Sequence, residues 1–296
     1  MKVAITGSSG LIGSALVDAL QARGDIPVRI TRGPGDGLQW NPEHGTIDAA
    51  GLDGMNAVVH LAGEGIAEKR WTPEQKQRIR DSRVEGTTLL AATLAGLAHP
   101  PTVLVSSSAI GWYGNRGDEV LTEDSGPPSP DEFLAAVCRE WEAVTAPAEA
   151  AGIRTVHLRT GIVLSRSGGA LASMLTPFKL GLGGRIGTGR QYMSWIALDD
   201  EVGAILHAID TAELRGPVNA TAPNPVTNAE FTKTLGKVLH RPTVLPTPLA
   251  PLKLKFGSEL VQSLLVDGQR VLPARLESSG YAFRHTTLES ALRDLV

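Results

Sequence analysis

Lys2-Val3-Ala4-Ile5-Thr6-Gly7-Ser8-Ser9-Gly10-Leu11-Ile12-Gly13 is the stretch that decides the fold. Apolar Val3 to Ile5 come before a glycine-rich turn, and apolar residues at helical spacing follow it. This order predicts a short buried strand, a tight turn and the start of a helix, which is typical of a dinucleotide site. The apolar face of the helix is formed by Leu11, Ala15, Leu16 and Leu20.

The three glycines of this GxxGxxG turn have separate roles. Gly7 allows the sharp exit from the strand, Gly10 lets a pyrophosphate approach the backbone, and Gly13 lets the helix pack closely on the sheet. The phosphates would then lie at the positive end of the helix. An ordinary strand-to-helix turn is the alternative, and the apolar flanks favour the dinucleotide site. The cofactor contacts predicted in this turn come from Gly7, Ser8, Gly10, Leu11, Ile12 and Gly13.

The second predicted strand, Val28 to Ile30, decides which dinucleotide is expected. Thr31 and Arg32 stand at its end, about 20 residues beyond the glycines, where the ribose is recognised. An acidic residue here would favour NAD, whereas the planar guanidinium of Arg32 suits a 2′-phosphate. We therefore predict NADP(H), with Thr31 and Arg32 as contacts; the alternative is a solvated loop arginine.

Composition excludes several functional classes. The chain has 296 residues and a formal net charge of −3, and no basic run suggests nucleic-acid binding. Cys138 is the only cysteine, which excludes an intrachain disulfide and a cysteine-rich metal cluster, and no metal site is expected. Without a leader or a long apolar stretch, we expect a cytoplasmic protein that makes no membrane contact.

Two further predicted strands end in residues suited to a binding site. Ala57 to Gly63 closes on Leu61, Ala62 and Gly63, which are small or apolar and leave room for a nucleotide. We interpret His60 as a hydrogen-bonded structural residue of that strand. Thr102 to Val105 leads into Ser106–Gly114, whose hydroxyls can hold a substrate carbonyl or hydroxyl; a purely structural serine turn is the alternative.

Helices are expected after these strands. Thr72-Pro73-Glu74-Gln75 starts a long helix that runs to about Gly96, and its Arg78 or Arg83 could reach the cofactor phosphates if turned inward. Asp131 can cap a later helix, and Thr227 to Glu230 caps another that reaches roughly His240.

The chain divides into two predicted parts. Residues 1–245 should form an α/β domain with a doubly wound parallel sheet, into which segments of a substrate lobe are inserted at about 165–195 and 217–245. Residues 246–296, which are rich in proline at their start, should form a small, largely helical C-terminal domain.

Several motifs resemble those of extended short-chain dehydrogenase/reductases. They are Thr6–Gly13, His60–Gly63, Ser106–Ser108 with Tyr113-Gly114, and Trp195–Asp200. More narrowly, the chain is similar to the atypical NADP-dependent group called "epimerase family protein". That resemblance rests on Gly63–Trp71, Ser82-Arg83, Leu158–Leu164, Gly181–Gly184, Gly189–Trp195, Asn219–Pro223 and Gly268–Pro273.

This resemblance implies where the cofactor lies. Leu61, Ala62 and Arg83 should lie near it, and Ile162 and Val163 should offer backbone contacts on the nicotinamide side. Ser106 belongs to the same predicted set. The resemblance also implies that the C-terminal domain has no defined function, and that the chain can form a homodimer through its helices.

The chain departs from the superfamily at the acid/base pair. Where a tyrosine and, four residues later, a lysine are usual, this chain has Leu134 and Cys138. Neither side chain can perform that chemistry. We hypothesise that Ser108, with Tyr113 or Glu64, orients and protonates a carbonyl instead.

Three functions are consistent with a predicted NADP(H) site that lacks the usual acid/base pair. The first is an NADP(H)-dependent oxidoreductase or epimerase acting on an unknown small-molecule substrate. The second is a protein that binds or senses NADP(H) and has lost catalysis. The third is a scaffold that binds a partner through its C-terminal lobe.

Overall fold

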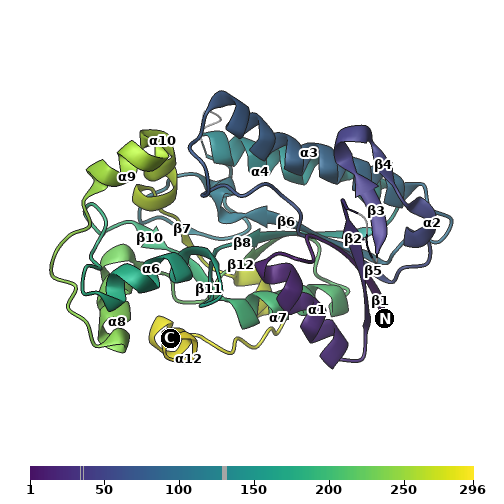
Figure 1. Cartoon of the computed structure of the whole chain (residues 1–296). Coiled ribbons are helices and arrows are strands. Elements are labelled where there is room, and N and C mark those ends of the chain that lie inside the picture. The colour runs from purple at the N-terminus through teal and green to yellow at the C-terminus, as the bar shows by residue number, and fades with distance from the viewer. Residues whose placement is uncertain (34, 36, 129–131) are drawn as a thin grey trace.

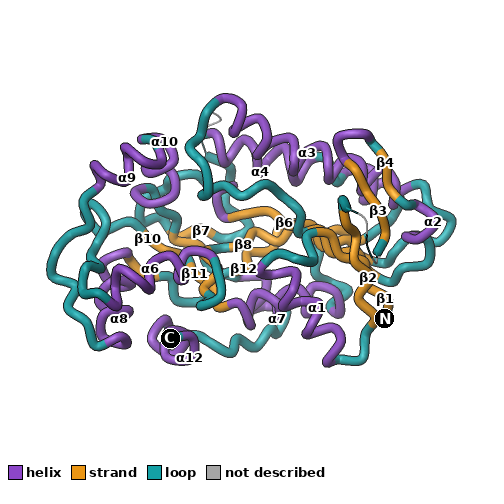
Figure 2. Tube along the Cα trace, in the orientation of Figure 1, coloured by secondary structure: helices purple, strands orange, loops and turns teal. Residues whose placement is uncertain are grey.

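The computed structural model describes residues 1–33, 35, 37–128 and 132–296, and its centre is a twisted sheet (Figures 1 and 2). The sheet has eight strands among these residues, in the order β12-β8-β6-β5-β1-β2-β3-β4. All neighbours are parallel except β3 and β4. The strands are β1 Lys2–Thr6, β2 Ile26–Thr31, β3 Leu38–Asn41, β4 Thr46–Ile47, β5 Ala57–His60, β6 Val103–Ala109, β8 Arg154–Thr160 and β12 Gly216–Ala220.

Helices cover both faces of this sheet. Figure 1 shows α1 (Leu11–Ala22) and α7 (Leu198–Asp210) below it, and α3 (Pro73–Ala95) and α4 (Phe133–Ala143) above it. Apolar side chains from β1, β5, β6, β8 and β12 pack with α1 and α7 in one core, and a second core lies toward α3. The strand order reverses beside β1, so the predicted doubly wound α/β fold is confirmed. The remaining helices on this domain are α2 Ala49–Leu52 and α5 Ala146–Ala150.

The expected helix limits agree with the structure where they can be compared. Thr72 accepts a hydrogen bond from Gln75 N and begins α3, which ends at Ala95. Thr227 and Glu230 form the reciprocal capping box that begins α8 (Asn228–Leu239). Asp131 lies outside the described residues, and α4 begins after Glu132.

A second lobe lies beyond the carboxyl ends of the main strands. It has its own core, which includes the buried side chains of Trp195, Phe231 and Leu292. β12 belongs to the main sheet, so the lobe resumes only after Ala220. The elements of this lobe and its surroundings are η2 Ile110–Tyr113, β7 Val120–Leu121, β9 Ile162–Leu164, α6 Gly169–Lys179, β10 Tyr192–Met193, β11 Trp195–Ala197 and β13 Val226–Thr227. The short helix η1 (Pro42–His44) instead connects β3 and β4 of the main sheet.

The C-terminal residues contact both the main domain and the second lobe. The backbone N–H groups of Arg284 and His285 donate to the buried Asp200 carboxylate at 2.7 and 2.9 Å, which fixes this segment to the start of α7. Helix α12 packs on α8, and β14 pairs with β7. The C-terminal elements are α9 Leu249–Phe256, α10 Ser258–Val261, the π-helical turn η3 Gln262–Val266, β14 Arg270–Val271, α11 Ala274–Ser278 and α12 Leu288–Leu295.

Candidate functional site

The glycine turn is built by three close backbone approaches. Gly7 has a φ of +65°, and a Cβ added there would lie 2.8 Å from the carbonyl carbon of Leu61. A Cβ on Gly13 would lie 2.2 Å from the Gly7 carbonyl oxygen, whereas one on Gly10 would lie 3.3 Å from the same atom. Gly7 and Gly13 are therefore needed for packing, and Gly10 leaves open a backbone surface on which a phosphate could rest.

Thr6 and His60 hold the two strand ends beside this turn. Thr6 Oγ1 accepts hydrogen bonds from the N–H groups of Leu61 and Ala62 at 3.1 and 3.2 Å, so its proton points to His60 Nδ1, 2.7 Å away. The His60 Nε2–H then donates to Thr87 Oγ1 at 2.9 Å. His60 is fully buried, and burial lowers its pKa to about 4. It is a neutral structural residue, as expected.

A cavity of about 430 Å³ opens over the carboxyl ends of β1, β2 and β5. It brings together eight of the predicted contacts, which come from three separate parts of the chain. Leu11, Ile12 and Gly13 lie at the start of α1, outside this lining. The predicted residues that line the cavity are Gly7, Ser8, Gly10, Thr31, Arg32, Leu61, Ala62 and Gly63.

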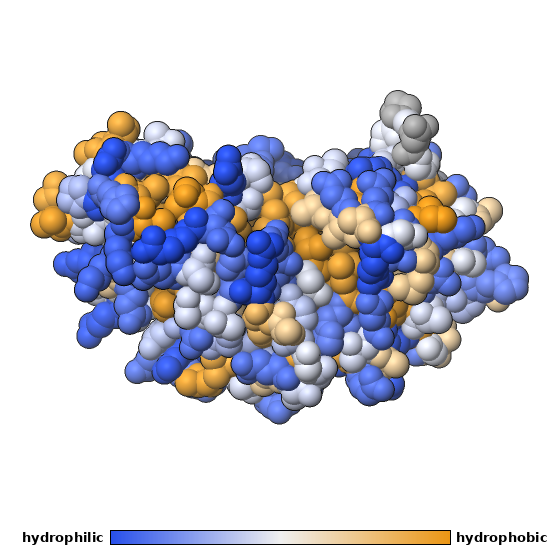
Figure 3. Space-filling model, turned by 90° about the horizontal axis from the view of Figure 1, so that it is seen from below, coloured by the Kyte–Doolittle hydropathy of each residue, from blue (hydrophilic) through white to orange (hydrophobic). Residues whose placement is uncertain are grey.

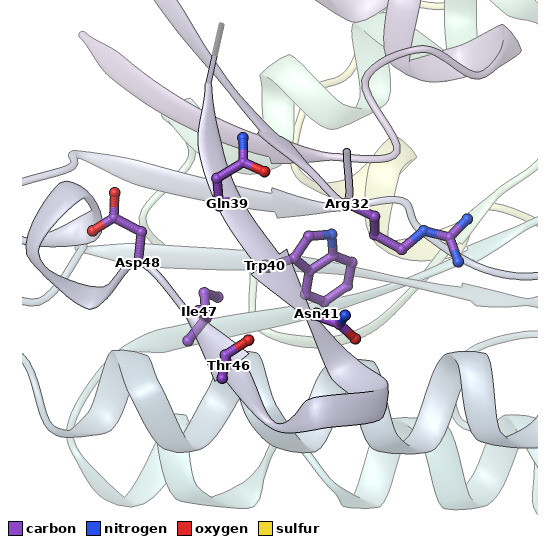
Figure 4. A pocket seen from close by; sticks show the side chains of 7 residues that line it. All are labelled: Arg32, Gln39, Trp40, Asn41, Thr46, Ile47 and Asp48. Atoms are coloured by element: carbon purple, nitrogen blue, oxygen red, sulfur yellow. The ribbon is translucent and has the colours of Figure 1, made fainter. Parts of the chain in front are cut away.

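An adjoining hollow of about 350 Å³ shares Arg32 and Trp40 with this cavity. Figure 4 shows the Arg32 side chain starting next to Trp40 and extending away from its ring, with Asp48 on the opposite side of the hollow. The Asp48 carboxylate accepts a hydrogen bond from Gly51 N at 2.9 Å. The Arg32 guanidinium has no ion-pair partner within the described part of the chain. The hollow thus has an exposed guanidinium at one end and the Trp40 ring in its wall.

Arg29 is a contributor that the sequence reasoning missed. Its Nη1 donates to the Ser8 carbonyl oxygen at 2.9 Å, so it holds the glycine turn from the neighbouring strand. The sequence did contain a signal for this role. Arg29 stands in β2 between the apolar residues Val28 and Ile30, and because alternate side chains of a strand point to opposite faces, Arg29 points to the other face from these two.

Arg83 is turned inward from α3 toward this region. Its Nη1 donates to the carbonyl oxygens of Glu64 and Ile79 at 3.0 and 3.1 Å, and its guanidinium lies 5.1 Å from the Trp141 ring centroid. A Cβ on Gly63 would approach the guanidinium carbon to 3.1 Å. The half-buried Arg83 therefore lies directly behind the cavity wall at Gly63, and desolvation lowers its pKa.

The segment that follows β8 approaches the start of α1. The N–H of Ile162 is already used, because it donates to the Ser194 carbonyl oxygen at 2.8 Å. A Cβ on Gly169 would lie 3.6 Å from both the Val163 carbonyl oxygen and a Leu11 methyl group. Val163 and Leu11 therefore lie close to each other, on either side of Gly169. Ser106 is buried in β6, and its hydroxyl has no hydrogen-bond partner among the described residues.

A buried polar network begins at Ser108. Its Oγ donates to Glu142 Oε1 at 2.6 Å, and the two Glu142 oxygens accept from Arg159 Nε and Nη2, each at 2.8 Å. Arg159 Nη1 donates to the Tyr113 hydroxyl at 3.0 Å, and that hydroxyl donates to Asn219 Oδ1 at 2.8 Å. The network links β6, α4, β8, η2 and β12.

Tyr113 and Glu64 have different surroundings. Tyr113 is fully buried, and burial raises the pKa of its hydroxyl, whose donor and acceptor roles are both occupied. Glu64 is half-buried; a hydrogen bond from Gln75 Nε2 at 3.2 Å lowers its pKa, and Lys69 lies 3.6 Å away. The network joins Ser108 to Tyr113, whereas no hydrogen bond joins either of them to Glu64 among the described residues.

Leu134 and Cys138, which stand at the positions of the absent tyrosine and lysine, lie together beside Gly111. A Cβ on Gly111 would lie 3.6 Å from the Leu134 Cβ and 3.9 Å from the Cys138 Sγ. Burial raises the pKa of the Cys138 thiol to about 12, so it stays neutral. Leu134 and Cys138 therefore offer neither a proton nor a positive charge at this place.

The described residues offer neither a metal centre nor a membrane-spanning helix. No group of three or more histidine, cysteine, aspartate or glutamate residues there could hold a metal ion. Within the same residues, every helix is too short or too polar to cross a bilayer.

The doubly wound sheet and its glycine turn define a Rossmann-type dinucleotide-binding protein. The chain belongs to the NAD dependent epimerase/dehydratase family, whose sequence model matches residues 3–220. A domain of unknown function, DUF1731, matches residues 247–295.

Relatives extend over almost the whole chain. "Epimerase family protein Mb2239" of Mycobacterium bovis is 47% identical over 295 residues, covering 98% of this chain and 96% of the relative. The crystal structure of human epimerase family protein SDR39U1 with NADPH superposes with a TM-score of 0.92 at 35% identity and covers 100% of this chain and 99% of the human one. UDP-N-acetylglucosamine 4-epimerase from Bacillus cereus, at 15% identity and a TM-score of 0.76 with 100% and 98% coverage, shares the fold.

Proposed function

We propose that this chain is an NADP(H)-dependent oxidoreductase or epimerase that transfers hydride to or from a carbonyl or hydroxyl group of a small molecule. The observation that carries the proposal is the glycine turn, in which bare backbone faces a cavity bounded by Arg32. The NADPH in the human relative supports the same cofactor.

The residues present fit such a cofactor. The exposed turn at Gly10 and the start of α1 would hold the pyrophosphate, and Arg32 would hold a 2′-phosphate. Leu61, Ala62 and Gly63 would line the opposite wall, with Ile162 and Val163 farther along. When bound, the nicotinamide supplies or accepts the hydride.

Ser108 is proposed to orient the substrate. Because its proton is directed at Glu142, its oxygen can only accept from a further group, and it suits a substrate hydroxyl better than a carbonyl. Tyr113 would act as a positioning residue that holds Arg159 from within the core. Glu64, a half-buried carboxylate, would accept the proton of a substrate hydroxyl during oxidation and return it to the substrate oxygen during carbonyl reduction.

Calorimetric titration with NADPH and NADH tests the cofactor part. Arg32→Ala should weaken NADPH binding about 10- to 100-fold, the loss of one charge-assisted contact, and leave NADH binding unchanged. Arg215→Ala removes an exposed arginine just before β12, near the opposite edge of the sheet, and should change neither affinity. Absence of NADPH binding by the unaltered chain would refute the proposal.

NADPH oxidation with a panel of carbonyl compounds tests the catalytic part. With a compound that reacts, Ser108→Ala or Glu64→Gln should lower kcat about 100-fold without changing NADPH affinity. Unchanged turnover in both variants would exclude these roles.

A catalytically reduced protein that binds or senses NADP(H) is the second candidate. It is favoured by the side chains of Leu134 and Cys138, which supply no acid or base at these two positions. Tight NADPH binding without NADPH oxidation by any compound of the panel would select this candidate.

A further inference from the structure

The second lobe exposes large apolar side chains at one end of the molecule. Among the described residues, five of the nine exposed large apolar side chains come from this lobe and the helix that follows it. They are Leu180, Leu182, Val244, Leu245 and Leu254, each between 67% and 85% exposed. Figure 3 shows groups of apolar side chains at its left-hand end, where Figure 1 places α9 and the connection from α8. Clusters of this kind on a protein surface mark a place where something binds.

The two loops that carry these side chains are held against each other. Arg241 Nε donates to the Lys179 carbonyl oxygen at 2.7 Å, and Thr247 N donates to the Arg185 carbonyl oxygen at 2.9 Å. Helix α9, which carries Leu254, begins shortly after Thr247. The apolar side chains of the two loops therefore belong to one surface. We call Leu180, Leu182, Val244 and Leu245 the apolar tip.

The apolar tip protrudes from a stiff backbone. Pro242, Pro246 and Pro248 restrict the chain on both sides of Val244 and Leu245. In Figure 3 the apolar groups at this end reach the outline of the molecule. A peptide or helix binds in a groove between side chains, whereas a lipid surface accepts side chains that protrude into it. The shape therefore favours a lipid surface.

The charges around the apolar tip have one sign. Residues 151–198 and 231–258 contain no aspartate or glutamate, although the net charge of the chain is −3. The flanking cations are Lys179 and Arg185 around the first loop, Arg241 before the second, and Lys253 and Lys255 on either side of Leu254. A surface of this sign attracts an anionic partner.

Two acids that approach this end of the molecule are already paired. Glu259, which follows α9, forms an ion pair with Lys76 of α3. Glu289 of α12 is held between Lys237 and Arg293 at 2.9 and 2.6 Å. Neither pair includes a cation that flanks the apolar tip.

The charge pattern also distinguishes between possible occupants. In a two-fold dimer built on this surface the same patch would face itself, so its cations would lie opposite cations. A membrane with anionic phospholipids suits both features of the surface, because its acyl boundary takes leucine and valine side chains and its headgroups attract lysine and arginine.

We propose that the apolar tip docks the second lobe on a membrane surface that contains anionic phospholipids. Leu180, Leu182, Val244 and Leu245 enter the acyl boundary, and the flanking cations lie at the headgroups. The sequence-based expectation of no membrane contact considered only leaders and spanning stretches, and docking needs neither. The proposal goes beyond the proposed function, and none of these residues is among those that line the dinucleotide cavity in the described chain.

Cosedimentation of the full chain with phospholipid vesicles tests the proposal. One set of vesicles contains phosphatidylcholine alone, and the other contains equal parts of phosphatidylcholine and phosphatidylglycerol. We expect binding to the anionic set to be at least about tenfold tighter, because each cation near an anionic surface adds to the attraction. Raising the salt from about 0.05 M to about 0.5 M should weaken this binding, since it shortens the screening length.

The apolar part of the surface is tested by Leu182→Ser combined with Leu245→Ser, which removes one leucine from each loop. This double variant should bind the anionic vesicles at least about tenfold more weakly. Ile26→Ser is the matched control, because it removes an exposed apolar side chain at the amino end of β2, beside Asp25. It should bind the vesicles as the unaltered chain does.

The cationic part is tested by Lys179→Gln combined with Lys255→Gln. This variant should bind the anionic vesicles about fivefold more weakly or worse and should leave binding to phosphatidylcholine unchanged. Lys2→Gln removes an exposed lysine at the amino end of β1 and should change binding less than about twofold. All variants should keep the Tm and the NADPH affinity of the unaltered chain, since the altered side chains are exposed and lie outside the cavity.

Sedimentation velocity without vesicles separates membrane docking from contact between copies of the chain. The double leucine variant should sediment as the unaltered chain does. If it instead dissociates an oligomer, the apolar tip holds a second copy and the proposal is wrong. Absence of vesicle binding, which would leave a protein as the partner, or equal vesicle binding by the double leucine variant and the unaltered chain would also overturn it. Loss of NADPH binding by the unaltered chain would refute the proposed function and leave the vesicle result standing.

Discussion

The Ser108 hydroxyl and the Glu142 carboxylate are joined by a hydrogen bond of 2.6 Å, and the same carboxylate is the bidentate partner of Arg159. Glu142 lies one helical turn beyond Cys138, so a buried ion pair stands close to the position at which a lysine was expected from the superfamily pattern. The serine is thereby coupled to a fixed negative charge.

Removal of one partner from this ion pair should be strongly destabilising. The side chains of Arg159 and Glu142 are only 3% and 11% exposed, so Glu142→Gln leaves a buried guanidinium without its counter-charge. We expect a loss of about 3–5 kcal/mol in the free energy of unfolding, measured by urea denaturation. Glu289→Gln breaks an exposed cluster on α12 and should leave the free energy of unfolding nearly unchanged, because solvent screens these charges. Equal, small losses in both variants would contradict the burial argument.

Two glycines of the turn should respond differently to alanine. Gly13→Ala places a methyl group 2.2 Å from the Gly7 carbonyl oxygen, where neither backbone can retreat, so the Tm should fall by several degrees or the chain should not fold. Gly10→Ala meets that oxygen only at 3.3 Å and should keep the fold while weakening NADPH binding. Circular dichroism melting and NADPH titration of both variants check this contrast. Equal melting temperatures would show that the turn tolerates a side chain at Gly13.

The sequence predicted those parts of the site that are local or repeated. The glycine turn is contiguous, and apolar runs mark the strands on either side of it. Parallel pairing then brings β2 and β5 beside β1, so Arg32 and Leu61 reach the same cavity from expected strand ends. The register that sets Thr6 opposite His60 follows from the same arrangement.

The Ser108 network could not be predicted in this way. Its links join residues 17 to 106 positions apart, and its members come from five elements whose side-chain directions depend on packing. β14 has only two residues and exists because β7 and Ser194 hold it, so no periodic pattern marks this strand. In the C-terminal domain, which was expected to be largely helical, α9 and α10 are separated at Gly257, which adopts a φ of +91°.

His60 should make stability depend on pH in the acidic range. Its pKa is about 4 in the folded chain and 6.5 in the reference state, so the folded state favours the neutral ring. This contribution is complete above pH 6.5 and is lost as the pH falls toward 4, with a maximum of about 3 kcal/mol. Denaturation of His60→Gln between pH 7 and 4.5 should show a smaller loss of stability than the unaltered chain. His44→Gln, which changes an exposed ring, should follow the unaltered chain; parallel curves for all three would contradict the prediction.

Glu201 should make the stability of the folded chain decrease as the pH rises through neutrality, the opposite of the effect of His60. Its carboxyl group is fully buried; Oε1 accepts from Thr160 Oγ1 at 2.8 Å, and Oε2 has no partner among the described residues. Burial raises its pKa from 4.5 to about 8, so the folded state retains a proton that the unfolded state releases. Stability is therefore lost as the pH rises from 4.5 to 8, by about 4 kcal/mol.

Glu201→Gln removes this titration and keeps the acceptor for Thr160. In urea denaturation at pH 5, 6.5 and 8, the free energy of unfolding of the variant should increase relative to that of the unaltered chain as the pH rises. The difference between the two free energies should be largest at pH 8. Glu277→Gln, at an exposed carboxylate, is the control and should leave the pH dependence as it is. A constant difference between Glu201→Gln and the unaltered chain would mean that Glu201 is already ionised in the folded protein. Because Thr160 directly precedes the Gly161-Ile162 segment near the site, that result would also place a buried negative charge beside the proposed nicotinamide contacts.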